Sequence, residues 1–147
     1  MIEPVSQNNI VEVLPLIRAY QEFYNVADIS DSKNEQFFSQ FGESNSTGCQ
    51  FIYRDNGVIV GFATVYFSYA SSITSKVAVL NDLYTTENSR GKGVGRKLID
   101  HCREFAASKN AARLQWVTAP ENTVAQGLYD SMNTSKSNWH FYTYATK

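Results

Sequence analysis

Residues 77–96 decide the fold, and they read Val77-Ala-Val-Leu-Asn-Asp-Leu-Tyr-Thr-Thr-Glu-Asn-Ser-Arg-Gly-Lys-Gly-Val-Gly-Arg96. The stretch begins as an apolar, β-branched run, which is typical of a strand, and ends in an Arg-Gly-x-Gly-x-Gly turn. Apolar residues at helical spacing follow the turn, so an amphipathic helix is expected from there to about Lys109. A strand, a glycine turn and a helix N-terminus together form an anion site. Backbone N–H groups without intrahelical acceptors point outward there, and the helix dipole adds about half a positive charge.

The composition of the turn suits a pyrophosphate. Three glycines let a phosphate approach the main chain because they lack Cβ atoms: Gly91, Gly93 and Gly95. Four cationic side chains lie close by in the sequence: Arg90, Lys92, Arg96 and Lys97. The turn matches neither the Rossmann fingerprint, which needs a third glycine three positions after the second, where this chain has Arg96 or Leu98, nor the Walker A loop, which needs Ser or Thr after Gly-Lys. On this stretch alone, a glycine-rich loop before a surface helix stays open as the alternative.

The composition of the whole chain limits the classes of function. The 147 residues are 43% hydrophobic and 18% charged, which predicts one globular domain over residues 1–147. A net charge of −1 argues against a nucleic-acid partner. No apolar run reaches the roughly 18 residues of a membrane span, and the N-terminus does not read as a signal peptide, so a cytoplasmic location is expected. The two cysteines and two histidines form no ligand spacing, so no metal site is expected.

The order of elements predicts an α+β fold. Asp55-Asn56-Gly57 is a strong hairpin turn, and Pro15 is expected to kink or restart the first helix. The expected strands are residues 2–5, 50–54, 58–67, 77–84, 114–118 and 139–145. The expected helices are residues 9–24, 35–41, 94–109 and one that begins near Asn122, with a loop over residues 25–34. This order gives a mixed central sheet of six to seven strands flanked by about four helices.

Two adjacent polar residues interrupt the strand before the glycine turn. Asn81 and Asp82 cannot both point outward, because successive side chains of a strand alternate between its two faces. One of them is therefore expected to face the interior or to lie in a bulge. A polar side chain that points into a sheet indicates a site more often than a packing irregularity.

Arg90-x-x-Gly93-x-Gly95 directly after a strand resembles the pyrophosphate loop of the GNAT superfamily of acyl-CoA N-acyltransferases. Glu121-Asn122-x-x-Ala125-x-x-Leu128-Tyr129 is similar to the helix that follows the fifth strand in this superfamily. The resemblance implies that Asn122 contacts the cofactor and that the Tyr129 hydroxyl protonates the departing thiolate of coenzyme A. A tyrosine with a purely structural role is the alternative for Tyr129.

Further segments resemble the polyamine and thialysine N-acetyltransferase branch. They are Leu80-Asn81-Asp82-Leu83-Tyr84 and Ser137-Asn138-Trp139. The resemblance implies acceptor contacts from Tyr24, Asn81 and Trp139. Acidic residues of that branch are replaced here by Asn81, by residues 70–72 (Ala-Ser-Ser) and by the residues before Trp139. A multiply charged polyamine would find few counter-charges, so a different primary amine is expected.

The resemblance implies direct attack of the amine on the thioester of acetyl-CoA within a ternary complex. An alkyl ammonium with a pKa of about 10.4 is neutral in only about one molecule per thousand near pH 7, so a base is needed. Asp82 is the first candidate, with Glu121 or Tyr84 acting through water as alternatives. A main-chain N–H near Leu83 would stabilise the developing oxyanion. The full expected cofactor-binding set is Leu83, Tyr84, Thr85, Arg90, Gly91, Lys92, Gly93, Val94, Gly95, Arg96 and Asn122.

Three functions are consistent with the sequence. The first is an N-acetyltransferase that acts on a small amine such as an amino acid. The second is a protein-lysine or histone-type acetyltransferase of the same fold, and the third is a non-catalytic acyl-CoA-binding module. The superfamily commonly forms homodimers, so a homodimer is expected as well.

Overall fold

A computed structural model describes all residues, 1–147, and its contacts divide the chain into two compact units, Met1–Trp116 and Val117–Lys147. The first unit holds one five-stranded sheet with strand order β1-β2-β3-β4-β5. The strands are β1 (Ile2–Pro4), β2 (Gly48–Asp55), β3 (Val58–Ala70), β4 (Ser75–Thr85) and β5 (Leu114–Gln115). The first four pair antiparallel and β5 pairs parallel to β4, so the sheet is mixed as predicted.

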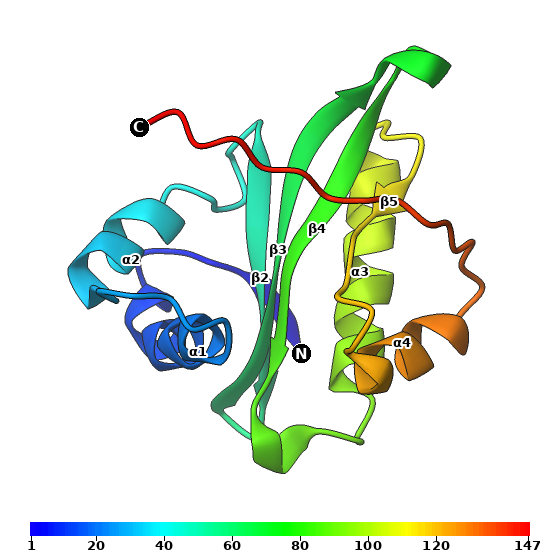
Figure 1. Cartoon of the computed structure of the whole chain (residues 1–147). Helices are drawn as coiled ribbons and strands as arrows, with labels where there is room; N and C mark the ends of the chain where they lie inside the picture. Colours follow the sequence, from blue (N-terminus) through cyan, green and yellow to red (C-terminus); the bar gives the residue numbers. More distant parts are fainter. The chain divides into compact units, whose positions relative to one another are not determined.

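Helices cover both faces of this sheet (Figure 1). On one face α1 (Ile10–Phe23) packs on β3 and β4, and α2 (Asp31–Phe38) packs on α1. On the other face α3 (Val94–Ser108) packs on β2, β3 and β4. Apolar side chains of α1 and the sheet form the core of the first face: Ile10, Val13, Leu16, Ile17, Ile52, Ile59 and Phe62.

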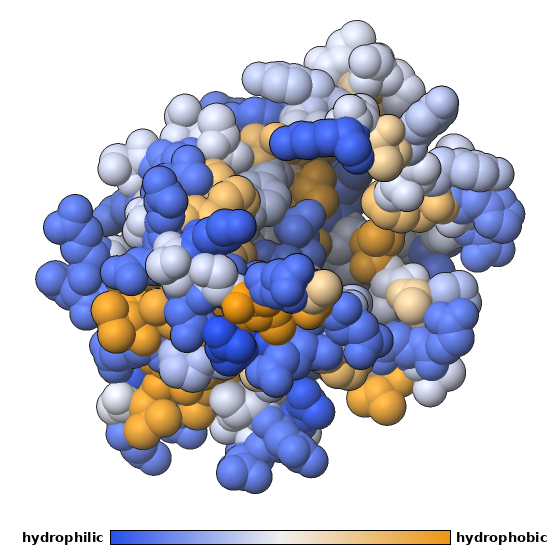
Figure 2. Space-filling view, turned by 60° about the vertical axis from the view of Figure 1, so that its left-hand side comes forward, coloured by the Kyte–Doolittle hydropathy of each residue, from blue (hydrophilic) through white to orange (hydrophobic).

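The surface that comes forward in Figure 2 is mostly hydrophilic, with separate apolar patches between the polar residues. Exposed large apolar or aromatic residues belong to α1, α2 and the connection between them: Val11, Phe23, Tyr24, Val26 and Phe37. Apolar residues exposed singly are ordinary on protein surfaces and do not by themselves indicate a partner.

The α+β class is confirmed, but the predicted number of strands is wrong, since the sheet has five strands and not six or seven. Residues 139–145 form no strand, although they alternate in the sequence. An alternating pattern makes a segment suitable for a sheet but does not supply the neighbouring strand that its backbone needs. Trp139 and Tyr144 accordingly have exposed side chains, at 86% and 96%.

Two helix predictions also need correction. Helix α1 runs through Pro15 as one helix, so it does not restart there; Pro15 and Val11 are both exposed, and water can satisfy the carbonyl that lacks a donor. Helix α2 begins at Asp31, four residues before the predicted start. The Ser30 side chain caps it by accepting a hydrogen bond from the Lys33 amide, so the end of the predicted loop is helical.

The strand pairing contains the predicted irregularity at Asn81 and Asp82. Thr64 on β3 pairs with Asp82 and Val65 pairs with Leu80, which leaves Asn81 as the extra residue of a β-bulge. Asp82 is buried and Asn81 is exposed. The bulge thus turns one polar side chain into the sheet and the other toward solvent.

The second unit contains α4 (Thr123–Asp130), whose first turn is capped by Asn122. The Asn122 side chain accepts a hydrogen bond from the Ala125 amide at 3.2 Å. No helix of either unit has the combination of length and apolar character that a membrane crossing requires.

Candidate active site

The glycine turn presents backbone amides at the N-terminus of α3. Gly91 and Gly93 both have left-handed backbones, with φ of +77° and +84°, and a Cβ atom on either would meet open space. The first amide that bonds back into the turn is that of Lys97, to the Gly93 carbonyl at 3.0 Å. The amides of residues 91–95 make no backbone hydrogen bond within the turn. The geometry is therefore that of an anion-binding helix N-terminus.

The turn is anchored to the sheet so that its amides and cations face outward. Val94 and Leu98 are buried against Gly61 of β3, where a Cβ would lie 3.1 Å from Val94. Arg90 donates a hydrogen bond to the Thr85 carbonyl at 3.1 Å, and its guanidinium lies 5.8 Å from the ring centre of Tyr84. Gly91, Lys92, Gly93 and Arg96 are exposed, and Gly95 is half-buried.

The strand that leads into the turn has one edge without a strand partner. β5 pairs with β4 only at Ala78 and Val79. From Leu80 to Thr85 that edge of β4 has no neighbouring strand, and three predicted cofactor-binding residues lie in it: Leu83, Tyr84 and Thr85. Main-chain groups on such an edge can pair with an extended ligand.

The side chain of Asp82 is buried, and hydrogen-bond donors lie next to its carboxylate. Asn81 donates to Asp82 Oδ1 at 3.0 Å, and hydrogen bonding by the hydroxyls of Thr64 and Tyr20 also lowers the pKa of this carboxylate. Burial raises the pKa of Asp82, and the three hydrogen bonds act in the opposite direction. A carboxylate in this setting can accept a proton or bind a cation.

Tyrosine side chains surround this carboxylate on the face that α1 covers. The Tyr20 ring lies 4.9 Å from that of Tyr24, the predicted acceptor contact, and 6.5 Å from that of Tyr84. Burial raises the pKa of Tyr20 and of Tyr66, and the charge of Asp82 raises both further, so both hydroxyls stay protonated and can donate. The structure thus brings together the predicted residues Tyr24, Asn81 and Asp82.

Four residues near Asp82 were not predicted from the sequence: Tyr20, Gln50, Thr64 and Tyr66. Gln50 and Thr64 are polar residues inside otherwise apolar strands, which is a pattern that could have indicated them. Tyr20 fits the apolar periodicity of α1, and nothing in its spacing distinguishes it from a core residue.

The remaining predicted residues lie in the second unit. Asn122 caps α4, and Tyr129 is half-buried on the same helix, two turns further on. Trp139 is exposed and donates from Nε1 to the Ser137 hydroxyl at 2.9 Å. The roles of these three residues stay predictions.

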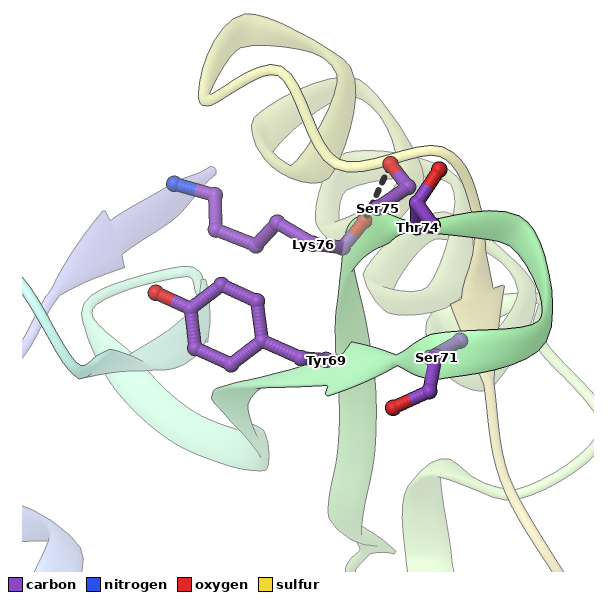
Figure 3. Close-up of a pocket in the computed structure, with 6 residues that line it drawn as sticks. Tyr69, Ser71, Thr74, Ser75 and Lys76 are labelled. Atoms are coloured by element: carbon purple, nitrogen blue, oxygen red, sulfur yellow. Dashed lines mark hydrogen bonds between the residues drawn. The ribbon is translucent and has the colours of Figure 1, made fainter.

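A shallow cavity of about 340 Å³ lies at the tip of the β3–β4 hairpin (Figure 3). Tyr69 and Lys76 form a cross-strand pair, and both side chains extend from the same side of the hairpin. The Ser75 hydroxyl donates to the Lys76 carbonyl at 3.2 Å, and Thr74 turns the chain with φ of +48°. The cavity contains no residue of the glycine turn or of the Asp82 cluster.

Comparison with known proteins decides the family. Residues 14–133 match the sequence model of the acetyltransferase (GNAT) family. The chain belongs to this family. It is an acetyl-CoA-dependent N-acetyltransferase, and acetyl-CoA is its cosubstrate.

Individual relatives agree with this assignment. The chain is 28% identical over 129 residues to the uncharacterized N-acetyltransferase YhfO of Bacillus subtilis, covering 88% of this chain and 85% of YhfO. It is 27% identical over 156 residues to the thialysine N-epsilon-acetyltransferase of Bos taurus, covering 98% of this chain and 91% of that enzyme. The crystal structure of a probable acetyltransferase superposes with a TM-score of 0.86 at 23% identity, covering 100% of this chain and 98% of the other. The structural match shows the same fold.

The residues of the first unit fit the diphosphate of this cosubstrate. The outward amides of residues 91–95 can donate to phosphate oxygens, and Arg90, Lys92 and Arg96 can neutralise its charge. The unpartnered edge of β4 offers main-chain groups to an extended chain. Which of these residues bind the cosubstrate stays a prediction.

Proposed function

We propose that this GNAT enzyme acetylates the primary amine of a small molecule, an amino acid or another modest amine, by direct attack in a ternary complex. The observation that carries the proposal is the buried carboxylate of Asp82 at the β4 bulge, on the strand that leads into the glycine turn. The similarity to thialysine N-epsilon-acetyltransferase, named for an amino-acid amine, supports the same class of acceptor.

A single negative charge suits an acceptor with one ammonium group at its reacting end. Burial and hydrogen bonds from neutral side chains determine the pKa shift of Asp82, and no second carboxylate contributes to it. A polyamine would need several counter-charges, whereas a monoamine needs one. The neighbouring Asn81 is neutral, so it supplies no counter-charge for a second ammonium group, and its side chain donates a hydrogen bond to Asp82.

In this mechanism the side chains of the first unit bind and deprotonate the amine. The Asp82 carboxylate pairs with the ammonium group and takes its proton, so that the nitrogen lone pair becomes available for attack. Tyr24, which packs on Tyr20, would contact the rest of the acceptor. Tyr84 and Glu121 are less suited as the base, since Tyr84 packs against Tyr20 and Phe62 and Glu121 is exposed.

Main-chain groups would serve the thioester side of the reaction. Bound acetyl-CoA supplies an activated acyl group. An amide near Leu83 would donate to the oxygen on which charge develops, and the amides of the glycine turn would hold the diphosphate. The hydroxyl of Tyr129 would return a proton to the leaving sulfur, a role that rests on the family resemblance.

A thiol-release screen tests the proposal. Acetyl-CoA is mixed with the protein and a panel of amino acids, simple monoamines, polyamines and lysine peptides, and free thiol is measured. We expect release with a monoamine or an amino acid. Faster release with peptides would contradict the proposal in favour of a protein-lysine acetyltransferase. Binding of acetyl-CoA without release for any amine would indicate an acyl-CoA-binding module.

A homodimer is part of the proposal, supported by the family resemblance. Sedimentation of the full chain would measure it directly. A mass equal to twice that of the 147-residue chain is expected, and a monomer over the same concentrations would contradict it.

A further inference from the structure

Three neighbouring strands place a row of buried polar side chains beneath the β4 bulge. Gln50 of β2 pairs with Thr64 of β3, and Thr64 pairs with Asp82 of β4. Gln50 and Thr64 are fully buried, and Asp82 is 6% exposed. Polar residues are seldom buried in the middle of a sheet unless hydrogen bonds satisfy them. The hydrogen bonds among these three side chains therefore indicate their role.

The hydrogen bonds of the row run in one direction, toward Asp82. Gln50 Nε2 donates to Thr64 Oγ1 at 3.3 Å. The Thr64 oxygen thus accepts from Gln50, and its own proton is left available for its cross-strand neighbour Asp82, whose pKa Thr64 lowers by hydrogen bonding. Asn81 Nδ2 donates to Oδ1 of the same carboxylate at 3.0 Å.

The orientation of the Gln50 amide leaves one of its own atoms without a partner. Gln50 Oε1 is buried and has no hydrogen-bond partner, which lowers stability. If the amide were turned over, Oε1 could accept from the Thr64 hydroxyl, and Asp82 would lose that donor. The orientation that leaves Gln50 Oε1 without a partner is therefore the one in which the Thr64 hydroxyl can donate to an ionised Asp82.

The main chain fixes Gln50 in this position from two further elements. Its amide donates to the Phe41 carbonyl at 2.9 Å, and its carbonyl accepts from the Val5 amide at 2.8 Å. Gln50 is thus held between the end of β1 and the segment after α2. A side chain on so rigid a support is suited to orienting another group.

We propose that Thr64 and Gln50 are positioning residues of the acetyl transfer: Thr64 holds the Asp82 carboxylate ionised and aimed at the acceptor ammonium, and Gln50 acts through Thr64 by fixing the direction of its hydroxyl. This inference rests on the proposed function, in which Asp82 binds and deprotonates the amine.

The other groups that face Asp82 do not replace this donor. Tyr20 of α1 and Tyr66 of β3 are the titratable residues beside it, and both stay protonated over the working range because their pKa values are raised. β4 contributes the neutral Asn81, and β2 contributes Gln50. No cationic side chain acts on the Asp82 carboxylate, so its neutral hydrogen-bond donors are what stabilises the charge against burial.

The pH profile of kcat/KM for an accepted amine tests the proposal. The acidic limb of this profile reports the pKa of Asp82 in the free enzyme. Thr64→Val removes the hydroxyl with little change of shape, and we expect it to move the limb upward by about one pH unit, since hydrogen bonds to charged groups have about that effect. Thr64→Ser keeps the hydroxyl and should restore the wild-type limb. Gln50→Leu should produce a smaller shift in the same direction.

Ile59→Val is the matched control, because it removes a methylene from the same buried face of β3 without touching the row. It should leave the limb in place. If Thr64→Val does not fold, Thr64→Ala and Gln50→Leu decide the same question. An unmoved limb in the Thr64 and Gln50 variants overturns the proposal. Asp82→Asn distinguishes failure of the proposed function from failure of this inference. If Asp82→Asn keeps the wild-type limb and turnover, Asp82 is not the base and the proposed function fails. If only Asp82→Asn loses the limb and the Thr64 and Gln50 variants keep it, Asp82 remains the base and only the positioning role of Thr64 and Gln50 fails.

Discussion

Asn81 and Asp82 are adjacent in the sequence, yet one is exposed and the other buried, and Asn81 Nδ2 donates to Asp82 Oδ1 at 3.0 Å. Successive side chains of a strand alternate between its two faces, and the β-bulge leaves Asn81 as the extra residue without a cross-strand partner. The carboxylate enters the sheet while its neighbour remains in solvent and caps it. A buried charge of this kind lowers stability, and the cost is measurable.

Asp82→Asn should stabilise the fold increasingly as pH rises. The folded-state pKa of Asp82 is raised, so the folded protein binds the proton more tightly than the unfolded chain does. Its contribution to stability is full below the unfolded pKa of about 3.9 and is lost as pH rises through the folded pKa. The amide that replaces the carboxyl imitates its protonated form and does not titrate, so the difference in unfolding free energy should favour the variant by about 1.4 kcal/mol for each unit by which the pKa is raised.

Urea unfolding of both proteins between about pH 4 and pH 8 measures this difference. Asp100→Asn makes the same carboxyl-to-amide change at an exposed position of α3 and is the matched control. A difference that shrinks with rising pH would contradict the buried and raised pKa of Asp82.

The irregularity at Asn81 and Asp82 could be predicted from the sequence, but the residues that surround Asp82 could not. Two polar residues side by side in an apolar strand predict an interruption, because the pleat has a period of two. Partners of Asp82 come from α1, which is far away in the sequence, and from β3, where only the register of the β3–β4 pairing brings Thr64 beside Asp82. A local pattern cannot contain that register.

Gly93→Ala should weaken acetyl-CoA binding much more than it weakens the fold. The backbone of Gly93 has φ of +84°, so a Cβ costs about 1 kcal/mol of strain, and it would also stand where a phosphate approaches the amides. We expect the Kd of acetyl-CoA to rise at least about tenfold, which is about 1.4 kcal/mol in binding. Isothermal titration calorimetry measures the Kd.

Gly57→Ala is the matched control for Gly93→Ala. Gly57 has nearly the same backbone, with φ of +80°, and open space around it, but it lies in the β2–β3 hairpin turn. Both variants should lose similar stability, and only Gly93→Ala should lose affinity. Equal affinities in the two variants would mean that the glycine turn does not hold the diphosphate.

The cysteines should be unreactive in the folded protein. Cys49 and Cys102 are both buried, and burial raises the pKa of Cys49 to about 12 and raises that of Cys102 as well. At about pH 8 only about one Cys49 thiol in ten thousand would then be ionised. An aromatic disulfide reagent should titrate no thiol in the native state and two after unfolding in guanidinium. Rapid titration of one thiol in the native state would contradict their burial.

The sequence correctly predicted the glycine turn and the helix that follows it, but it wrongly predicted a strand over residues 139–145. Glycine-rich turns before an amphipathic helix depend on local backbone geometry, which the residues themselves encode. The strand predicted for residues 139–145 depended on a neighbouring strand that the pattern cannot specify. Five strands therefore form where six or seven were expected.

Tyr129→Phe should lower turnover and leave acetyl-CoA affinity nearly unchanged, if the hydroxyl protonates the leaving thiolate as the family resemblance implies. Loss of a general acid costs about a hundredfold to ten-thousandfold in kcat, whereas the phenyl ring keeps the packing of α4. Steady-state kcat and the directly measured Kd of acetyl-CoA separate the two effects. Tyr53→Phe, which removes a hydroxyl of β2 that lies 3.5 Å from the Lys97 ammonium, is the control and should keep kcat. Equal losses of kcat and affinity in Tyr129→Phe would instead assign this residue to binding or to the structure of the second unit.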